Sequence, residues 1–303
     1  MALSLHQISR WYKMLTGKSV WHVNQDIGKY FSKDSIAGYY NNMMEKVTKM
    51  PDLLDNNELP QLNLANDKFV YFPVAIFQYG LGAYDLYLQT KDQRYVRKFI
   101  QCANWAIEHQ DVEGRWNNFF YVYPDTPYGA MAQGEAVSLL VRAYLYSKDE
   151  KYLISAQKGI DYMLKPSDKG GVTMYNEGDV VFLEYTHLPI VLNGWIFAWW
   201  GLYDYVLVTQ DHGIYSSMMK QSLNTLLKYM PKFKNWCWSI YSVDKKIASP
   251  FYHNLHIAQM QAMYQITGID MFERYSERWL RQQANPLYKG LAFIGKAVQK
   301  LLE

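Results

Sequence analysis

A repeat of helical hairpins is the feature of this 303-residue sequence that most constrains its fold. Four segments share one pattern, in which an apolar, aromatic helix is followed by a short polar turn and an amphipathic helix. The segments begin at Gly80, Gln133, Asn193 and Leu255. The first helix of each pair is apolar nearly all round, as a helix buried on both sides should be. The second helix carries the charges and should face water.

The polar turns inside the hairpins also repeat. Their aspartates, Asp92, Asp149, Asp211 and Asp270, are separated by 57, 62 and 59 residues. Each aspartate, with a nearby Ser or Thr, could cap the next helix by accepting its free N–H groups. An inner and an outer helix repeated in this way predict an all-α fold, an (α/α) toroid of about four helical hairpins. We expect residues 1–303 to form a single domain, with residues 1–60 as an N-terminal helical extension that includes a helix over 38–50.

The connectors from one hairpin to the next are long and aromatic, and they span residues 62–75, 114–132, 170–192 and 235–254. Successive helices alternate in direction, so all long connectors should lie at one end of the toroid, where we expect short β-hairpins. Long connectors on a rigid scaffold are common places for functional sites. The aromatic content of 17% suits either a large core or a surface that stacks on sugar rings.

The overall composition argues against several classes of protein. A net charge of +3 is too small to predict nucleic-acid binding. Cys102 and Cys237 have no paired spacing, which suits buried thiols in a reducing compartment. The first residues are too polar for a signal peptide. The most apolar run, 190–208, contains Asn193, Gly194 and Asp204 and is typical of a buried helix rather than a transmembrane span. We therefore expect a cytoplasmic or membrane-associated protein, and a homodimer is left open.

Glu184 and Tyr185 form the first candidate site. They follow the apolar run 180–183 and precede an apolar helix, so Glu184 should lie in a partly dry cleft. Partial burial raises the pKa of a carboxylic acid toward the range useful for proton transfer. The alternative is a glutamate in a surface loop or at a helix cap.

Tyr252, His253 and His256 form the second candidate, because Tyr and His can both move protons. Alternatively, His256 is a core residue of the inner helix and His253 caps that helix. Two histidines three residues apart could also face one zinc ion, but the sequence offers no third ligand nearby, so we expect no metal.

Tyr241 is the third candidate, and it lies close to Trp238 and Lys245. A tyrosine of this kind could also be an ordinary strand residue in a hairpin, and Lys245 with Lys246 could be a solvated turn.

Arg115 and Trp116, with the aromatic stretch 119–128 that contains Tyr123 and Tyr128, form the fourth candidate. Trp and Tyr could stack on sugars, and Arg could pair with a carboxylate through two hydrogen bonds. The alternative is a hairpin packed on the ring. No Gly-rich phosphate loop, Gly-x-Ser-x-Gly or Cys-x-x-Cys motif occurs, which argues against nucleotide cofactors and serine hydrolases. We expect no cofactor.

Taken in order, several short motifs resemble the C-terminal catalytic region of the D-glucuronyl C5-epimerases, which convert glucuronate to iduronate in heparan-type chains. The resemblance runs from about residue 39 to residue 282. It is carried by residues 71–73, 78–81, Gln133-Gly134, 140–144, Glu184-Tyr185, Pro189, 191–194, 201–204, Tyr252-His253, His256 and Gln259.

This resemblance implies a catalytic set made of a Glu-Tyr pair and two further tyrosines, matched here by Glu184, Tyr185, Tyr241 and Tyr252. The sequence departs from the vertebrate enzymes in having no β-rich domains before the helical region. It also has Asp244 where those enzymes carry an arginine. Arg115, Lys245 or Lys246 could supply the missing positive charge. The other residues expected to contact substrate are Trp116, Tyr123, Tyr128, Gln133, Asn193, Trp238, His253 and His256.

The resulting hypothesis is a uronate C5-epimerase that acts on a polysaccharide without a redox cofactor. Glu184 and Tyr252 would carry the proton on the two faces of the sugar, while Tyr185 and Tyr241 would orient and protonate its carboxylate. The alternatives are a polysaccharide lyase, a glycoside hydrolase that uses Asp125, Asp179 or Glu184, and a glycan-binding module without activity.

Overall fold

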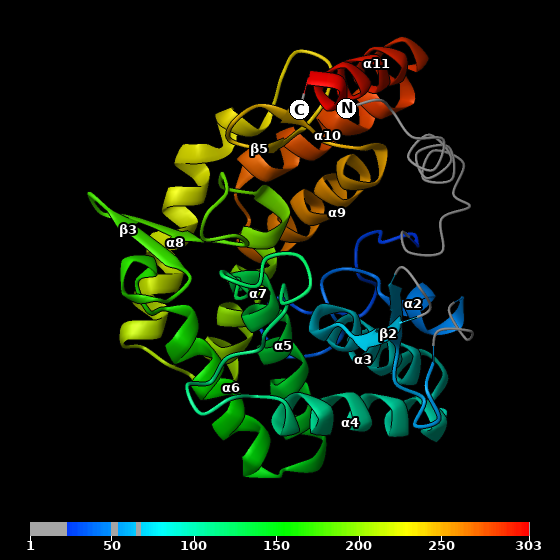
Figure 1. Ribbon diagram of the computed structural model, residues 1–303, viewed down its shortest axis with the longest axis vertical. Coiled ribbons are helices and arrows are strands. Elements are labelled where there is room, and N and C mark those ends of the chain that lie inside the picture. The colour runs from blue at the N-terminus through cyan, green and yellow to red at the C-terminus, as the bar shows by residue number, and fades with distance from the viewer. Residues whose placement is uncertain (1–22, 50–53, 65–67, 303) are drawn as a thin grey trace.

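Four helical hairpins build the protein, as the computed structural model shows for the residues that it describes, 23–49, 54–64 and 68–302 (Figure 1). The predicted all-α (α/α) toroid is confirmed. The pairs are α3 (Pro73–Thr90) with α4 (Gln93–Glu108), α5 (Ala130–Ser147) with α6 (Glu150–Met163), α7 (Leu192–Thr209) with α8 (Ile214–Tyr229), and α9 (Pro250–Thr267) with α10 (Asp270–Ala284). A further helix, α11 (Pro286–Leu302), follows them.

The first helices of the four pairs form the inner wall. Helix α3 packs on α5, α5 on α7, and α7 on α9. These helices are buried on nearly all sides, and α7 contributes the fully buried rings of Trp195, Trp199 and Trp200. The second helices are amphipathic and have one face in water. The predicted division into inner and outer helices therefore holds.

In each hairpin the inner helix ends at a residue with left-handed backbone conformation, but the aspartates that follow differ in how they contact the next helix. Three inner helices end at a non-glycine residue in the left-handed region, Lys91, Lys148 or Gln210, and α9 ends at Gly268. Asp92 and Asp149 then accept a hydrogen bond from the first turn of the next helix. Asp211 accepts from two backbone N–H groups although it precedes the N-cap. The expectation for Asp270 was wrong, because this residue begins α10 and makes no capping hydrogen bond.

Residues 23–49 close the ring between α9 and α3, and we call them the closing segment. Helix α2 (Met44–Thr48) packs on α3, while Asn254 of α9 donates to Asn24 and Asp26 (Figure 1). The helix predicted over 38–50 is therefore much shorter, and within 23–49 only α2 is helical. The chain folds back on itself instead, with Gly28 N–H donating to the Tyr40 carbonyl. Residues 1–22 of the predicted helical extension lie outside the described residues.

A buried ion pair fastens the closing segment to the inner helices. Arg142 of α5 and Asp204 of α7 meet at 2.5 Å, and both side chains are almost inaccessible to solvent. The guanidinium also donates to the carbonyl oxygens of Ala37 and Gly38, and the Tyr40 hydroxyl donates to Asp204 at 2.5 Å. These contacts satisfy the polar groups that burial would otherwise leave unpaired.

Short antiparallel strand pairs lie in three of the connectors. They are β1 (Gln61–Leu64) with β2 (Lys68–Tyr71), β3 (Thr173–Asn176) with β4 (Asp179–Phe182), and β5 (Ile240–Ser242) with β6 (Lys246–Ile247). Two 3-10 turns, Ser167–Lys169 and Met230–Phe233, complete them. The fourth connector, between α4 and α5, consists of turns. The β-hairpins expected in the connectors are thus present.

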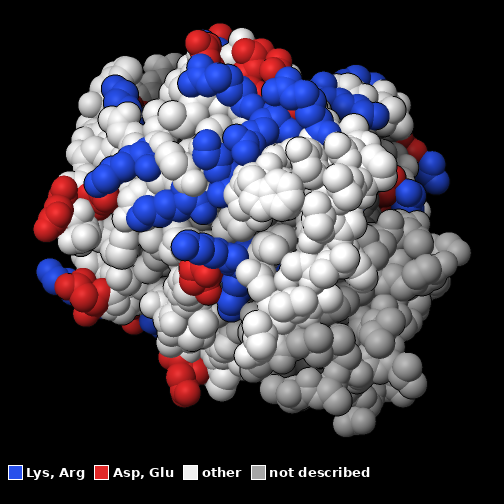
Figure 2. Space-filling view, turned by 90° about the horizontal axis from the view of Figure 1, so that it is seen from above, with Lys and Arg blue, Asp and Glu red and all other residues white. Residues whose placement is uncertain are grey.

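Lys and Arg gather in a broad band across the face of the molecule seen from above (Figure 2). Acidic side chains are sparse within this band. The apolar run 190–208 lies almost wholly in the buried helix α7. No helix of the described part of the chain is both long and apolar enough to cross a bilayer.

Candidate active site

A pocket of about 210 Å³ opens where the inner helices begin. The first turns of all four inner helices contribute to its wall, so the positive ends of their dipoles gather around it. The connectors on either side of the α5–α6 hairpin, the residue before α3 and the closing segment complete the wall. Besides Glu184, Tyr185, Asn193, Tyr252 and Lys46, the lining residues are Gln25, Phe72, Val74, Gln78, Asn118, Phe119, Met131, Phe197, Phe251 and Leu255.

Glu184 lies where β4 leads toward α7, and it is only 6% exposed. Leu183 holds this stretch in place, because its carbonyl accepts a hydrogen bond from Ala130 of α5. The carboxyl group rests against Gly194, where a Cβ atom would lie 2.2 Å from Glu184 Oε2. Burial raises the pKa of Glu184 to about 7, and Tyr185 opposes the shift. A carboxyl group with this pKa can both accept and release a proton near neutral pH.

Tyr185 is held by aromatic contacts. Its ring stacks on Phe119 with centroids 4.6 Å apart and meets the edge of Tyr123 at 5.7 Å. Burial, followed by the negative charge of Glu184, raises the pKa of the Tyr185 hydroxyl well above its ordinary value. Tyr185 therefore remains protonated and can act as a hydrogen-bond donor. Tyr123 supports this ring and does not itself line the pocket.

Tyr241 and Tyr252 complete the group of four predicted catalytic residues. Tyr252 stands in the first turn of α9, after the N-cap Ser249, and lines the pocket. The Tyr241 ring, on β5, lies 4.8 Å from the Tyr252 ring. Burial and then the charge of Glu184 raise the pKa of Tyr241. The structure thus brings together four side chains that are up to 68 positions apart in the sequence.

The floor of the pocket is polar. Asn193 donates to Glu184 Oε2 at 3.4 Å, and Asn193 Oδ1 has no hydrogen-bond partner among the described residues. Gln78 donates to Glu135, whose second carboxyl oxygen also lacks a partner there. Burial raises the pKa of Glu135 to about 8. Gln133 is fully buried below the pocket, where it donates to the Trp116 carbonyl, and is not a lining residue.

Lys46 is a lining residue that the sequence did not single out. It lies on α2 of the closing segment and is partly exposed. Burial of its ammonium group lowers the pKa of Lys46 to about 8, and the charge of Glu135 opposes this shift. In the sequence, Lys46 looks like one charge of a solvated helix face shared with Glu45 and Lys49, so no local signal marks it.

Arg115, Trp116 and Tyr128 lie away from the pocket. Arg115 pairs with Asp111 at 2.7 Å and stacks on the Tyr128 ring. Trp116 has no exposed surface, and its indole N–H donates to the Ala106 carbonyl. These residues therefore pack the wall between hairpins, and the structure does not bring them together with Glu184.

Trp238, His253 and His256 belong to a buried cluster behind the pocket. The Trp238 and His253 rings stack with centroids 3.6 Å apart. Both histidines lie within hydrogen-bond distance of the Ser239 hydroxyl. Burial lowers the pKa of each to about 3, so both are neutral at physiological pH. His256 is thus the core residue that the sequence offered as an alternative, whereas His253 is also buried and the N-cap of α9 is Ser249.

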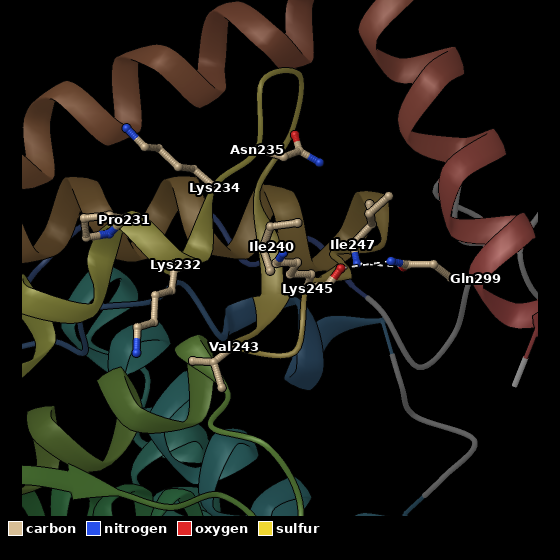
Figure 3. A pocket seen from close by; sticks show the side chains of 9 residues that line it. All are labelled: Pro231, Lys232, Lys234, Asn235, Ile240, Val243, Lys245, Ile247 and Gln299. Atoms are coloured by element: carbon tan, nitrogen blue, oxygen red, sulfur yellow. Dashed lines mark hydrogen bonds between the residues drawn. The ribbon is translucent and has the colours of Figure 1, made fainter.

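Lys245 lines a separate groove of about 740 Å³ (Figure 3). Lys232 and Lys234 line the same groove, and none of its described lining residues is acidic. Ile240 of β5 points into it, whereas the neighbouring Tyr241 contacts Tyr252. The next residue, Lys246, lies 3.8 Å from Asp244. The cations that the sequence suggested for the active site are thus held elsewhere.

Acidic residues other than Glu184 are absent from the described lining of the pocket. Asp179 of β4 pairs with Lys228 of α8 at 2.8 Å. Asp125 lies in the connector between α4 and α5. Within the described residues, no group of three or more His, Cys, Asp or Glu side chains is arranged to hold a metal ion.

A family model described as "D-glucuronyl C5-epimerase C-terminus" matches residues 113–281, which include Glu184, Tyr185, Tyr241 and Tyr252. The match covers more than half of the chain. Lys46 lies outside it.

Two relatives align over 221 residues, 64% of this chain. A Caenorhabditis elegans protein named D-glucuronyl C5-epimerase is 24% identical, and the aligned part is 36% of its length. The chain thus spans about a third of that relative. An uncharacterized protein of Methanocaldococcus jannaschii is 30% identical over 71% of its length.

Two solved structures share part of the architecture at 10% sequence identity. A structure named for UGL with dGlcA-Glc-Rha-Glc has a TM-score of 0.46 and covers 71% of this chain and 62% of its own. A polysaccharide lyase has a TM-score of 0.42 over 82% of this chain and 38% of its own.

Proposed function

The chain belongs to the family of the D-glucuronyl C5-epimerase C-terminus, and from this premise we propose that it is a polysaccharide uronate C5-epimerase. It would invert C5 of glucuronate residues by removing a proton and returning one to the opposite face. The observation that carries the proposal is that Glu184, Tyr185 and Tyr252 line one pocket, with the Tyr241 ring against Tyr252.

The chemistry explains why such a group is needed. When a base takes the C5 proton, the electron pair of the C–H bond moves toward the neighbouring carboxylate, which is already negative. Donors and cations must offset that charge before the proton becomes acidic enough to leave. A second acid must then deliver a proton to the other face of C5, which restores a neutral carbon with inverted configuration.

The four residues fit these tasks. Glu184 is the base, because burial places its pKa at about 7 and its carboxylate form is available above that pH. Tyr252, which comes from α9 rather than from the connector before α7, is the second proton carrier. Tyr185 and Tyr241 have raised pKa values and stay protonated, so they donate to the substrate carboxylate.

An acidic polymer is supported as the substrate class by the charge of the molecule. The band of Lys and Arg in Figure 2 and the groove lined by Lys232, Lys234 and Lys245 attract polyanions. A glucuronate polymer carries a carboxylate at regular intervals and meets this requirement. The substrate polymer, the cytoplasmic location and the homodimer stay predictions.

The proposal is tested by proton NMR of a panel of uronic-acid polymers incubated with the protein in deuterated water. The wild-type protein should replace the C5 hydrogen by deuterium and produce the C5-inverted sugar. Glu184→Gln and Tyr252→Phe should each reduce the rate by about 10²-fold or more, the range for loss of a proton carrier. Tyr128→Phe, which changes a tyrosine outside the pocket, should leave the rate unchanged.

Other outcomes would replace the proposal. Undiminished exchange in Tyr252→Phe would remove this tyrosine from the mechanism. A product that absorbs in the ultraviolet would indicate a lyase, in which the same carbanion expels the C4 substituent. New reducing ends would indicate a hydrolase, although that reaction needs two carboxyl groups. Binding with no chemical change would indicate a glycan-binding module.

A further inference from the structure

The active site needs a positive charge that the known pattern of residues does not supply. Arg115 and Lys245, which the sequence suggested for this role, lie outside the pocket. Among the described residues that line the pocket, Lys46 is the one cation. It reaches the pocket from the closing segment, outside the part of the chain that matches the family model.

The closing segment holds Lys46 in place by backbone packing. Met43 and Met44 are buried against the inner helices. The Met43 carbonyl approaches Gly82 of α3 so closely that a Cβ atom there would lie 2.3 Å from the carbonyl oxygen. This contact fixes α2 against α3. Lys46 is thus positioned by the fold and is not a freely moving surface lysine.

We propose that Lys46 binds and neutralises the carboxylate of the uronate unit in the pocket. This inference rests on the proposed function. It assigns to Lys46 the charge that makes the C5 hydrogen acidic, and it makes the closing segment part of the active site. The residue also gives the pocket a preference for acidic over neutral sugars.

The electrostatic setting leaves this charge available to a ligand. Lys46 forms no salt bridge with any residue that the structure describes, and Glu135 of α5 is the acid whose charge acts on it. Burial raises the pKa of Glu135 to about 8, so this group is mostly protonated at neutral pH and does not cancel the ammonium. Burial lowers the pKa of Lys46 because the ammonium is solvated less well there than in water. An anionic ligand would remove that deficit.

If Lys46 were the base instead of a carboxylate-binding cation, activity would depend on pH in the opposite way. The other groups that face the pocket are Glu184 and Tyr185 from the connector, Gln78 from α3 and Tyr252 from α9. If Lys46 were the base, its neutral amine would be needed, and activity would rise with pH through about 8. As a carboxylate-binding cation, it must be charged, and activity should fall through the same range.

Binding provides the first test, because it does not depend on which reaction follows. The affinity of wild-type protein for a uronic-acid polymer is compared with its affinity for the carboxyl-reduced form of that polymer by calorimetry. The wild type should prefer the acidic polymer. Lys46→Met should lose about 10-fold or more of this preference, as expected for a charge-assisted hydrogen bond, and Lys46→Arg should retain it. Lys49→Met is the matched control, because Lys49 is exposed and pairs with Glu45.

The pH dependence of kcat/KM for C5 exchange provides the second test. The wild-type profile should fall above about pH 8, and in Lys46→Arg this limb should move to higher pH because arginine stays charged. In the profile of kcat, activity should fall at a higher pH than in the profile of kcat/KM, since the bound carboxylate favours the ammonium form of Lys46.

The role of Lys46 would be overturned if Lys46→Met kept the preference for the acidic polymer. It would also be overturned if the alkaline fall in activity stayed at the same pH in Lys46→Arg. A different result would overturn only the proposed reaction. In that case the wild-type protein prefers the acidic polymer and Lys46→Met loses this preference, but the wild-type protein shows no C5 exchange.

Discussion

Glu184 shows how one residue couples activity to stability. Burial raises its pKa from an ordinary value of 4.5 to about 7, so the folded protein binds this proton more tightly than the unfolded chain does. Its contribution to stability is therefore fully present below about pH 4.5 and is lost as the pH rises through about 7. The carboxylate form, which is the base in the proposed reaction, is the form that burial disfavours.

We predict that Glu184→Gln removes this part of the pH dependence. Relative to the variant, the wild type should lose about 3 kcal/mol of unfolding free energy between about pH 4 and about pH 8, since one pKa unit corresponds to about 1.4 kcal/mol. Urea denaturation of both proteins at the two pH values measures the difference. Glu150→Gln, at an exposed position, should change the pH dependence of the unfolding free energy little. If the wild type and Glu184→Gln had the same pH dependence, the raised pKa of Glu184 would be contradicted.

Which single residues the sequence could identify depends on their local context. Glu184 stood out because an acid directly follows an apolar strand. Arg115 was expected at the site, but Asp111 and Glu113, close by in the chain, hold it in ion pairs. Lys46 could not be found from the sequence, because its place in the pocket depends on the packing of α2 on α3.

At the scale of the element, the first turn of α7 is built around the acid that it faces. Gly194 leaves room for the Glu184 carboxyl group, and any side chain would displace it. We predict that Gly194→Ala lowers the C5 exchange rate by about 10²-fold, because small displacements of a catalytic group have effects of this size. The deuterium exchange assay measures this loss.

A second glycine gives the matched control. Gly290, in α11, has open space around it and an ordinary helical backbone. Gly290→Ala should raise the unfolding free energy by about 0.5–1 kcal/mol and leave exchange unchanged, because alanine favours the helix. Full activity in Gly194→Ala would show that Glu184 does not need its present position.

The hairpins themselves were predictable because their signals are local. Apolar and charged faces separate the inner from the outer helices, and Asp92 and Asp149 mark the starts of α4 and α6. Asp270 looked equivalent, yet Gly268 ends α9 and α10 begins at the aspartate itself. The extra residue in this turn, Ile269, takes the N-cap position and leaves Asp270 one position too late to cap the helix.

At the scale of the whole molecule, the ion pair of Arg142 with Asp204 joins α5, α7 and the closing segment. We predict that Arg142→Met lowers the unfolding free energy by about 3–5 kcal/mol, because it leaves Asp204 buried without its partner. Urea denaturation measures this change. Hydrogen exchange of the backbone amides of residues 38–42 should also become faster.

An exposed ion pair supplies the comparison. Arg94 pairs with Asp92 on the surface, so Arg94→Met should lower the unfolding free energy far less than Arg142→Met does. Similar losses in both variants would show that the buried pair does not tie the molecule together.

The closure of the ring was beyond prediction, since it depends on contacts between distant parts of the chain. Four hairpins implied a ring of helices, and the sequence suggested that the N-terminal region would extend it with further helix. The structure instead closes the gap between α9 and α3 with a largely irregular segment. Its backbone is satisfied by long-range hydrogen bonds, such as the one from Tyr39 to Asp85, which no local pattern encodes.

This closure has a consequence for how the chain is made. Asn24 is synthesised 230 residues before its partner Asn254. Each hairpin can form from neighbouring residues as it emerges, whereas bringing the two ends of the ring together requires the longest loop in the protein to close. The closing segment is therefore among the last of the described parts of the chain to reach its final place, and Lys46 joins the pocket only when folding is nearly complete.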